Sequence, residues 1–294
     1  MRRGIGVSLL VLVVVLLGGA SLLEARQLQV VTTFSILQDF VQQVGGEQVV
    51  VRSLVPLGAD PHTWEPSPRE AGLIARADLV VANGGGFDDW LLPVVQSAAR
   101  TGVGVLRVAE DLPVLEGAGH EHAADPHLWL SVPNAVSYVE RIAQALQELR
   151  PESAAYFAQR ADAYIQRLHL LDEKLQSELG QIPAENRVIV AYHNAFSYLA
   201  ERYGFAAVDF LVDNPEAEPN PRDLGRLVDL LRGMERPVVF TEPQLNAGSR
   251  YMRALAQEVG AEVFTLYSDS LTAEVPTYVD LMENNLQVLV EALR

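Results

Sequence analysis

Short apolar runs alternate with longer amphipathic segments through the first half of the chain. Apolar runs rich in β-branched residues predict buried strands, and three-and-four spacing of apolar positions predicts helices. The predicted strands are 28–33, 48–55, 78–82 and 103–108, and the predicted helices are 35–44 (capped by Ser35), 68–77, 87–100 and 133–149. Strands that are apolar on both faces and alternate with helices predict a parallel sheet of the α/β class.

The longest helical pattern in the chain begins at Pro151. No Gly or Pro interrupts it before Gly180, and a helix of that length spans about 40 Å. Such a helix suits a rigid connection between two lobes, although an ordinary long surface helix of one domain has the same pattern.

The α/β rhythm then begins again. The second set of predicted strands is 187–191, 206–212, 237–241 and 261–266, and the predicted helices are 196–203, 222–234, 249–259 and 277–293. We therefore predict two Rossmann-like α/β lobes with parallel sheets, at 26–150 and 181–294, joined by a single backbone helix at 151–180.

The first 25 residues have the layout of a secretory signal. Arg2 and Arg3 precede an apolar run from Val7 to Leu17, and small residues follow at 18–21. We expect removal of residues 1–25 and a periplasmic or cell-surface location. Retention as an uncleaved anchor helix is the alternative.

Composition narrows the classes of partner and of site chemistry. The net charge of −16 argues against nucleic acid as a partner, because phosphate binding needs clustered Lys and Arg. The chain has no cysteine, which excludes disulfides, thiolate metal ligands and a cysteine-linked lipid anchor. We expect a monomer whose metal site, if it has one, is built from nitrogen and oxygen.

Half of the six histidines occur where a predicted strand runs into a loop. His62 follows the second predicted strand, His127 lies in an Asp-Pro-His sequence, and His193 follows the strand at 187–191. Asp269 lies just beyond the last predicted strand. Ligands of open α/β sheets bind outside the carboxyl ends of the strands. We therefore predict a metal site in the interlobe cleft, with two ligands from each lobe.

The predicted ligands are three imidazoles and one carboxylate. Four N/O ligands suit tetrahedral Zn²⁺, whereas Mn²⁺ favours a shell richer in oxygen and of higher coordination number. Zinc is therefore the first choice. Manganese remains the alternative, because a bidentate Asp269 would raise the coordination number.

Five motifs together resemble the zinc- and manganese-binding solute-binding proteins of bacterial ABC importers. They are GADPHTWEPSP at 58–68, DPHLWLS at 125–131, AYHNAF at 191–196, FTEPQ at 240–244 and SDSL…TYVDLMENN at 268–285. The resemblance covers essentially the whole chain after the signal. It implies ligands at His62, His127, His193 and Asp269, two lobes with little closure, a metal ion as cargo, and delivery to a membrane permease.

Two features depart from that family. Many members carry a lipid-anchoring cysteine, which this chain lacks. Zinc-specific members often have a long His-rich loop before the second ligand, whereas only His120 and His122 occur here. The third ligand can be His or Glu in the family, and His193 resembles the zinc-type or mixed-specificity members.

Two other functions remain open at this point. A secreted zinc hydrolase would keep an open water position on its metal, and the fourth ligand position argues against it. A receptor for a metal chelate or larger ligand would need a roomy site. Glu65 and Glu242 are candidates to orient the imidazoles, and Trp64, Trp90 and Trp129 are expected to pack around the site.

Overall fold

The computed structural model describes residues 26–100, 102–115 and 125–294. The predicted signal at 1–25 and the pair His120 and His122 lie outside the described residues. Within those residues, no helix combines the length and the apolar character that a membrane crossing requires.

The first half of the chain forms a four-stranded parallel sheet in the order β2-β1-β3-β4. Its strands are β1 (Leu28–Thr32), β2 (Val49–Ser53), β3 (Leu79–Ala82) and β4 (Gly104–Arg107), and its helices are α1 (Ser35–Gly45), α2 (Pro68–Ile74) and α3 (Leu92–Ala98). All four side chains of β3 are buried, as expected for a central strand covered on both faces.

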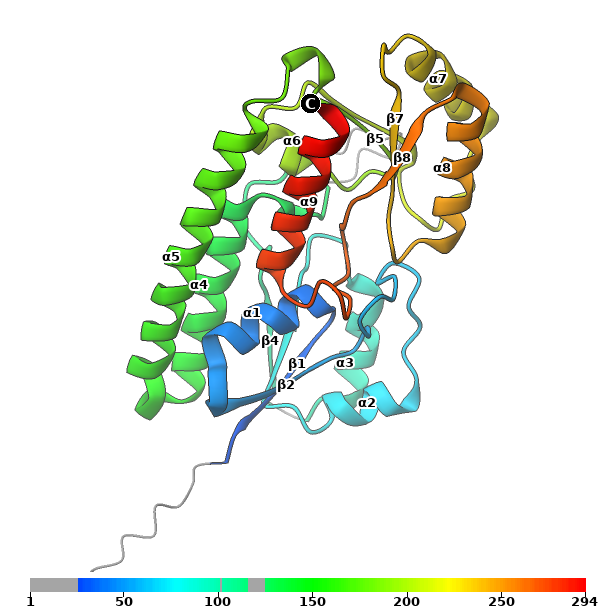
Figure 1. Cartoon of the computed structure of the whole chain (residues 1–294). Coiled ribbons are helices and arrows are strands. Elements are labelled where there is room, and N and C mark those ends of the chain that lie inside the picture. The colour runs from blue at the N-terminus through cyan, green and yellow to red at the C-terminus, as the bar shows by residue number, and fades with distance from the viewer. Residues whose placement is uncertain (1–25, 101, 116–124) are drawn as a thin grey trace, which may run out of the picture.

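The second half forms two parallel strand pairs, β5-β6 and β7-β8, with β5 in contact with β7. The strands are β5 (Val188–His193), β6 (Ala207–Val212), β7 (Val238–Thr241) and β8 (Glu262–Thr265), and the helices are α6 (Ser197–Tyr203), α7 (Pro221–Arg232) and α8 (Asn246–Val259). In Figure 1 these strands occupy the upper part of the molecule, and the four-stranded sheet occupies the lower part.

Three long helices connect the two parts. They are α4 (Val132–Leu149), α5 (Ala154–Leu179) and α9 (Tyr278–Leu293). Helix α5 runs beside α4 along the length of the molecule and also contacts α1 and α9 (Figure 1). Its buried side recurs every three or four residues, from Phe157 to Leu179, which places an apolar stripe against these neighbours.

The helix α5 is fixed to both parts by buried polar contacts. Tyr164 Oη donates a long hydrogen bond of 3.4 Å to the carboxylate of Asp39 on α1. At the other end, the buried Asp172 accepts hydrogen bonds from Arg202 Nε at 3.1 Å and Tyr203 Oη at 3.0 Å, both on α6. These contacts hold the helix in one orientation relative to both sheets.

The predicted α/β class, the parallel sheets and the long helix are confirmed. Several local predictions differ from the structure. The helix predicted at 87–100 is an α-helix only over Leu92–Ala98. Ser35 is the first residue of α1 and does not cap it; its hydroxyl accepts a hydrogen bond from Leu271 N instead. His193 is the last residue of β5, so that strand continues two residues beyond the predicted end. The lobe boundaries at 150 and 180 stay a prediction.

Candidate metal centre

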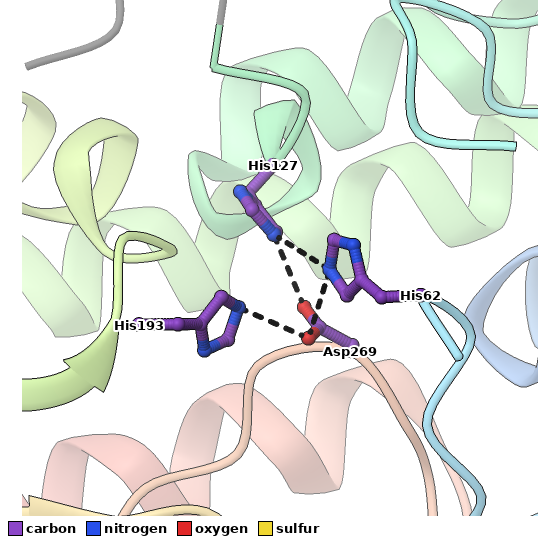
Figure 2. A group of neighbouring side chains, drawn as sticks. All are labelled: His62, His127, His193 and Asp269. Carbon is purple, nitrogen blue, oxygen red and sulfur yellow. Dashed lines mark hydrogen bonds and ion pairs between the residues drawn. The ribbon is translucent and has the colours of Figure 1, made fainter. Parts of the chain in front are cut away.

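The side chains of His62, His127, His193 and Asp269 meet between the two parts of the molecule (Figure 2). Each offers one ligand atom, and these atoms all lie within 4.8 Å of one another. His62 comes from the loop after β2, and His127 immediately precedes a 3₁₀ turn at Leu128–Leu130. His193 ends β5 and Asp269 follows β8. The carboxyl ends of parallel strands thus carry three of these four groups close together.

The distances among the four groups fit the edges of a small polyhedron. Nε2 of His62 is 3.4 Å from Nε2 of His127, and Nε2 of His193 is 3.3 Å from Oδ2 of Asp269. Asp269 also lies 3.5 Å from Nε2 of His62 and 3.6 Å from Nε2 of His127. Ligands about 2.0–2.1 Å from Zn²⁺ at the corners of a tetrahedron are about 3.3–3.4 Å apart. These four distances therefore match the edges of a tetrahedral site, within an overall spread of 4.8 Å among the ligand atoms.

The site is enclosed, and His62 is its most accessible member. The His62 side chain is 9% exposed, whereas those of His193 and Asp269 are 0% exposed. Among the described residues, His193 Nε2 and Asp269 Oδ1 are buried without a hydrogen-bond partner. Buried polar atoms without partners are costly, so a cation at the centre would satisfy both of them.

Two further carboxylates contact Nδ1 of two imidazoles, on the side of each ring away from the centre of the site. Asp125 Oδ1 lies 2.8 Å from Nδ1 of His127 and also accepts the backbone N–H of His127 at 2.9 Å. Glu242 Oε1 lies 2.9 Å from Nδ1 of His193. An Nδ1–H donated to a carboxylate leaves Nε2 as the lone-pair nitrogen, and Nε2 is the atom that faces the centre of the site.

The charges of the site shift two pKa values in opposite directions. Burial alone would lower the pKa of His193, but the carboxylates of Glu242 and Asp269 outweigh it and hold that pKa well above its usual range. Burial alone would raise the pKa of Asp269, but His193 and His127 outweigh it and hold that pKa well below its usual range. His193 and Asp269 therefore each stabilise the charged form of the other.

Aromatic rings form an apolar wall on one side of the histidines. The ring centroid of Phe87 lies 4.8 Å from that of His62 and 5.8 Å from that of His127, and Trp129 lies 5.3 Å from His127. Trp129 is fully buried and Phe87 nearly so. A wall of this kind keeps water away and strengthens electrostatic interactions inside the site.

Phe87 reaches this position because of the glycines that precede it. Gly84, Gly85 and Gly86 all have positive φ, at 81°, 63° and 90°, where a side chain would be strained. The carboxylate of Asp88 accepts the backbone N–H groups of Asn83 at 2.6 Å and Gly84 at 2.9 Å, which closes the turn. The glycine run thus serves to place Phe87 beside the imidazoles.

The structure separates the other residues that the sequence singled out. Trp129 packs on His127 and Glu242 contacts His193, whereas Glu65 is exposed and His169 lies exposed on α5. Trp64 and Trp90 are partly buried against the core. The prediction overlooked Asp125, Phe87, Ser268 and Gln244. Of these, Asp125 could have been found, because it lies two residues before His127 in the same motif.

Hydrogen bonds across the molecule join the loops that carry the four groups. Gly58 N, in the loop of His62, donates to Ser270 Oγ at 2.9 Å and to Leu271 O at 2.8 Å, both next to Asp269. Tyr198 Oη of α6 donates to the backbone oxygen of Asp125 at 3.0 Å. These bonds hold the loops of His62, His127 and Asp269 in place independently of the ligand side chains.

Comparison with known proteins gives one consistent picture. A family profile described as "Zinc-uptake complex component A periplasmic" matches residues 30–292. The chain is 34% identical over 275 residues to the manganese-binding lipoprotein MntA of Halalkalibacterium halodurans, covering 92% of this chain and 90% of that protein. It is 35% identical over 272 residues to the iron-binding protein YfeA of Yersinia pestis, covering 91% and 86%.

A solved structure shares the whole architecture. The periplasmic zinc-binding protein TroA of Treponema pallidum superposes with a TM-score of 0.83 at 28% identity, covering 91% of this chain and 99% of that one. Several relatives are named lipoproteins. Those names contradict the prediction that this protein is not a cysteine-linked lipoprotein, and the prediction is not kept, although cysteine is absent from all 294 residues.

Proposed function

Because this chain belongs to the family of periplasmic zinc-uptake components, we propose that it captures one divalent transition-metal ion, zinc, through His62, His127, His193 and Asp269. The family and the relatives make the protein a metal-binding substrate-binding protein of an ABC transporter and not an enzyme. Such proteins work outside the cytoplasm with membrane permease and ATPase components. We propose that this one is exported, acts as a monomer and hands its ion to such a permease.

The convergence of four ligand atoms from loops of both parts of the molecule carries this proposal. The space among them fits an ion and is too small for a metal chelate or a larger ligand, because the atoms lie within 4.8 Å of one another. Four protein ligands also leave no open position for a catalytic water, which argues against a zinc hydrolase. The chemistry of the site is therefore capture and release.

Zinc is proposed over manganese on the basis of ligand type and spacing. Three imidazole nitrogens and one carboxylate suit zinc, and the distances of 3.3–3.6 Å fit a tetrahedron. Manganese is the second candidate, because MntA is named as manganese-binding. Both oxygens of Asp269 face histidines, so bidentate coordination would give manganese a larger shell.

Equilibrium dialysis of chelator-stripped protein against Zn²⁺ and Mn²⁺, alone and in competition, tests the proposal. We expect about one tightly bound Zn²⁺ per chain and preference for Zn²⁺ in competition. Unchanged affinity in a His62→Ala/His193→Ala variant would contradict the ligand set. Preferential retention of Mn²⁺ would replace zinc by the second candidate.

A further inference from the structure

Glu242 is a buried carboxylate that contacts one proposed ligand, His193, and is linked to a second, Asp269, through neighbouring side chains. It lies directly after β7 and is 1% exposed. One of its oxygens faces His193, and the other faces a small polar network that ends at Asp269. Glu242 can therefore orient two of the proposed ligands without itself contacting the bound ion.

The first contact fixes the ring of His193. Oε1 of Glu242 lies 2.9 Å from Nδ1, while Nε2 of the same ring faces Asp269 at 3.3 Å. A proton on Nδ1 is held by the carboxylate, so the lone pair of the neutral ring is on Nε2. The contact also stops rotation of the ring, because the two nitrogens are held on opposite sides.

The second contact reaches Asp269 through two neutral side chains. Ser268 Oγ donates to Oε2 of Glu242, and Gln244 Nε2 lies 2.7 Å from Ser268 Oγ. The same Gln244 amide donates to Oδ2 of Asp269 at 3.3 Å. All three residues are buried. The network thus sets the orientation of the Asp269 carboxylate relative to His193.

The carboxylate of Glu242 is paired with a histidine and not with a Lys or Arg among the described residues. Over the described part of the chain, its only ion pair is the one with His193, and neither Lys nor Arg takes part in its hydrogen bonds. A buried ion pair is weak evidence for stability, so the presence of Glu242 beside a proposed ligand is better explained by the metal site than by the fold. A divalent cation on Nε2 of His193 would face this carboxylate across the imidazole ring.

We propose that Glu242 is a positioning residue for metal capture, which orients His193 directly and Asp269 through Ser268 and Gln244. This inference rests on the proposed function. It adds that the affinity of the second-half ligands depends on a carboxylate that never contacts the ion. Among the described residues, Asp125 plays the corresponding part for His127, and its hydrogen bonds there join only His127, Leu115 and Tyr198.

The test compares Glu242→Gln and Glu242→Ala with wild type. Glu242→Gln keeps an oxygen acceptor for Nδ1 and removes the charge, whereas Glu242→Ala removes both. The matched control is Glu65→Gln, which removes an exposed carboxylate three positions from His62. Zn²⁺ affinity is measured by chelator competition, the ligand field by the visible absorption of the Co²⁺-loaded protein, and the fold by thermal unfolding of the metal-free protein.

Loss of an orienting carboxylate typically weakens metal binding about 10–100-fold. We expect a loss of that size in Glu242→Ala, a smaller one in Glu242→Gln, and a changed Co²⁺ absorption in both. The metal-free melting temperature of Glu242→Gln should change little, because glutamine keeps an oxygen acceptor for Nδ1 of His193. Glu65→Gln should match wild type in all three measurements.

The possible failures are distinguishable. If wild-type protein binds no metal, the proposed function fails and this inference fails with it. If wild type binds Zn²⁺ and both Glu242 variants bind it with unchanged affinity and unchanged Co²⁺ absorption, the positioning role alone is wrong. A lower metal-free melting temperature with wild-type Zn²⁺ affinity would likewise overturn it, in favour of a structural role.

Discussion

The indole Nε1 of Trp129 donates a hydrogen bond of 2.8 Å to the backbone oxygen of Ser268. This bond joins the loop that carries His127 to the loop that carries Asp269. Tyr278 Oη of α9 donates to the backbone oxygen of Trp129 at 2.7 Å, so the same residue is also tied to the closing helix. Two of the proposed ligands are thus held in register by a contact that needs no metal.

The substitution Trp129→Phe should separate this contact from the packing around it. Phenylalanine keeps most of the apolar volume but leaves the buried oxygen of Ser268 without its donor, which costs about 1–3 kcal/mol. We expect a lower melting temperature and a Zn²⁺ affinity reduced by about tenfold, because His127 and Asp269 are no longer held together. Thermal unfolding and chelator competition measure the two effects.

Trp90→Phe is the matched control. The indole Nε1 of Trp90 is buried without a hydrogen-bond partner among the described residues, so its removal takes away no bond. We expect wild-type Zn²⁺ affinity and an unchanged or higher melting temperature. Equal losses in the two variants would mean that indole volume, and not the bond to Ser268, holds the loops.

Much of the site was predictable because three of the four proposed ligands lie close to the end of an apolar run. His62, His193 and Asp269 come at or after strands whose carboxyl ends meet, a rule that holds for parallel sheets in general. Strand and helix positions followed from local periodicity in the same way, to within a few residues. Local patterns are sufficient where the determining contacts are themselves local.

The rest depended on contacts between distant segments. The network of Glu242, Ser268 and Gln244 forms only because β7 and β8 pair in one register, which no local pattern specifies. Phe87 reaches the histidines through three positive-φ glycines, a turn that the apolar pattern does not specify. Helix α9 follows the last strand in sequence yet packs on α1 and α5.

Metal binding should stabilise the protein against heat by an amount that grows with the logarithm of its affinity. A ligand at 100 times its Kd contributes about 2.7 kcal/mol of stability. We expect saturating Zn²⁺ to raise the melting temperature of wild type and to raise that of His62→Ala far less. His169→Ala, which removes an exposed histidine on α5, is the control and should respond as wild type does. A full response in His62→Ala would remove that residue from the ligand set.

Asp39 makes the stability of the fold depend on pH in the direction opposite to that usual for a carboxyl group. It is buried on α1 and accepts the backbone N–H of Tyr278, the first residue of α9, at 2.9 Å. Burial raises its pKa, with a smaller contribution from Asp280, and the hydrogen bonds from Tyr278, Gln43 and Tyr164 offset only part of the shift. The folded protein therefore binds the Asp39 proton more tightly than the unfolded chain does.

The contribution of Asp39 to stability is thus greatest below its unfolded pKa and is lost as pH rises through the raised folded value. We expect Asp39→Asn to increase the free energy of unfolding at pH 7 and to have less effect near pH 4. Urea unfolding of metal-free protein across this range measures it. A loss of stability in Asp39→Asn that does not change with pH would show that the carboxyl is needed for its bonds alone.

Asp78→Asn should change the stability at pH 7 in the direction opposite to Asp39→Asn. Burial alone would raise the pKa of Asp78, but hydrogen bonds from Gln29 N and from Arg26 outweigh it and lower the pKa. The ionised form is therefore the stabilising one, and its contribution is lost as pH falls through the lowered folded value. The variant should be less stable than wild type at pH 7, and the difference should shrink in acid.

His193→Glu should show how Glu242 constrains the third ligand position. A glutamate there brings a second carboxylate towards a buried one that already faces position 193 at 2.9 Å, and an uncompensated buried charge costs about 3–5 kcal/mol. We expect the metal-free variant to lose stability, and the double variant His193→Glu/Glu242→Gln to recover part of it.

Residues in contact couple by about 0.5–3 kcal/mol, so urea unfolding of the four proteins in the presence of chelator can resolve the interaction. The added oxygen ligand should also shift competition from Zn²⁺ towards Mn²⁺ in the double variant. Strictly additive losses would mean that the two positions do not interact through charge, and that Glu242 tolerates a carboxylate as readily as an imidazole.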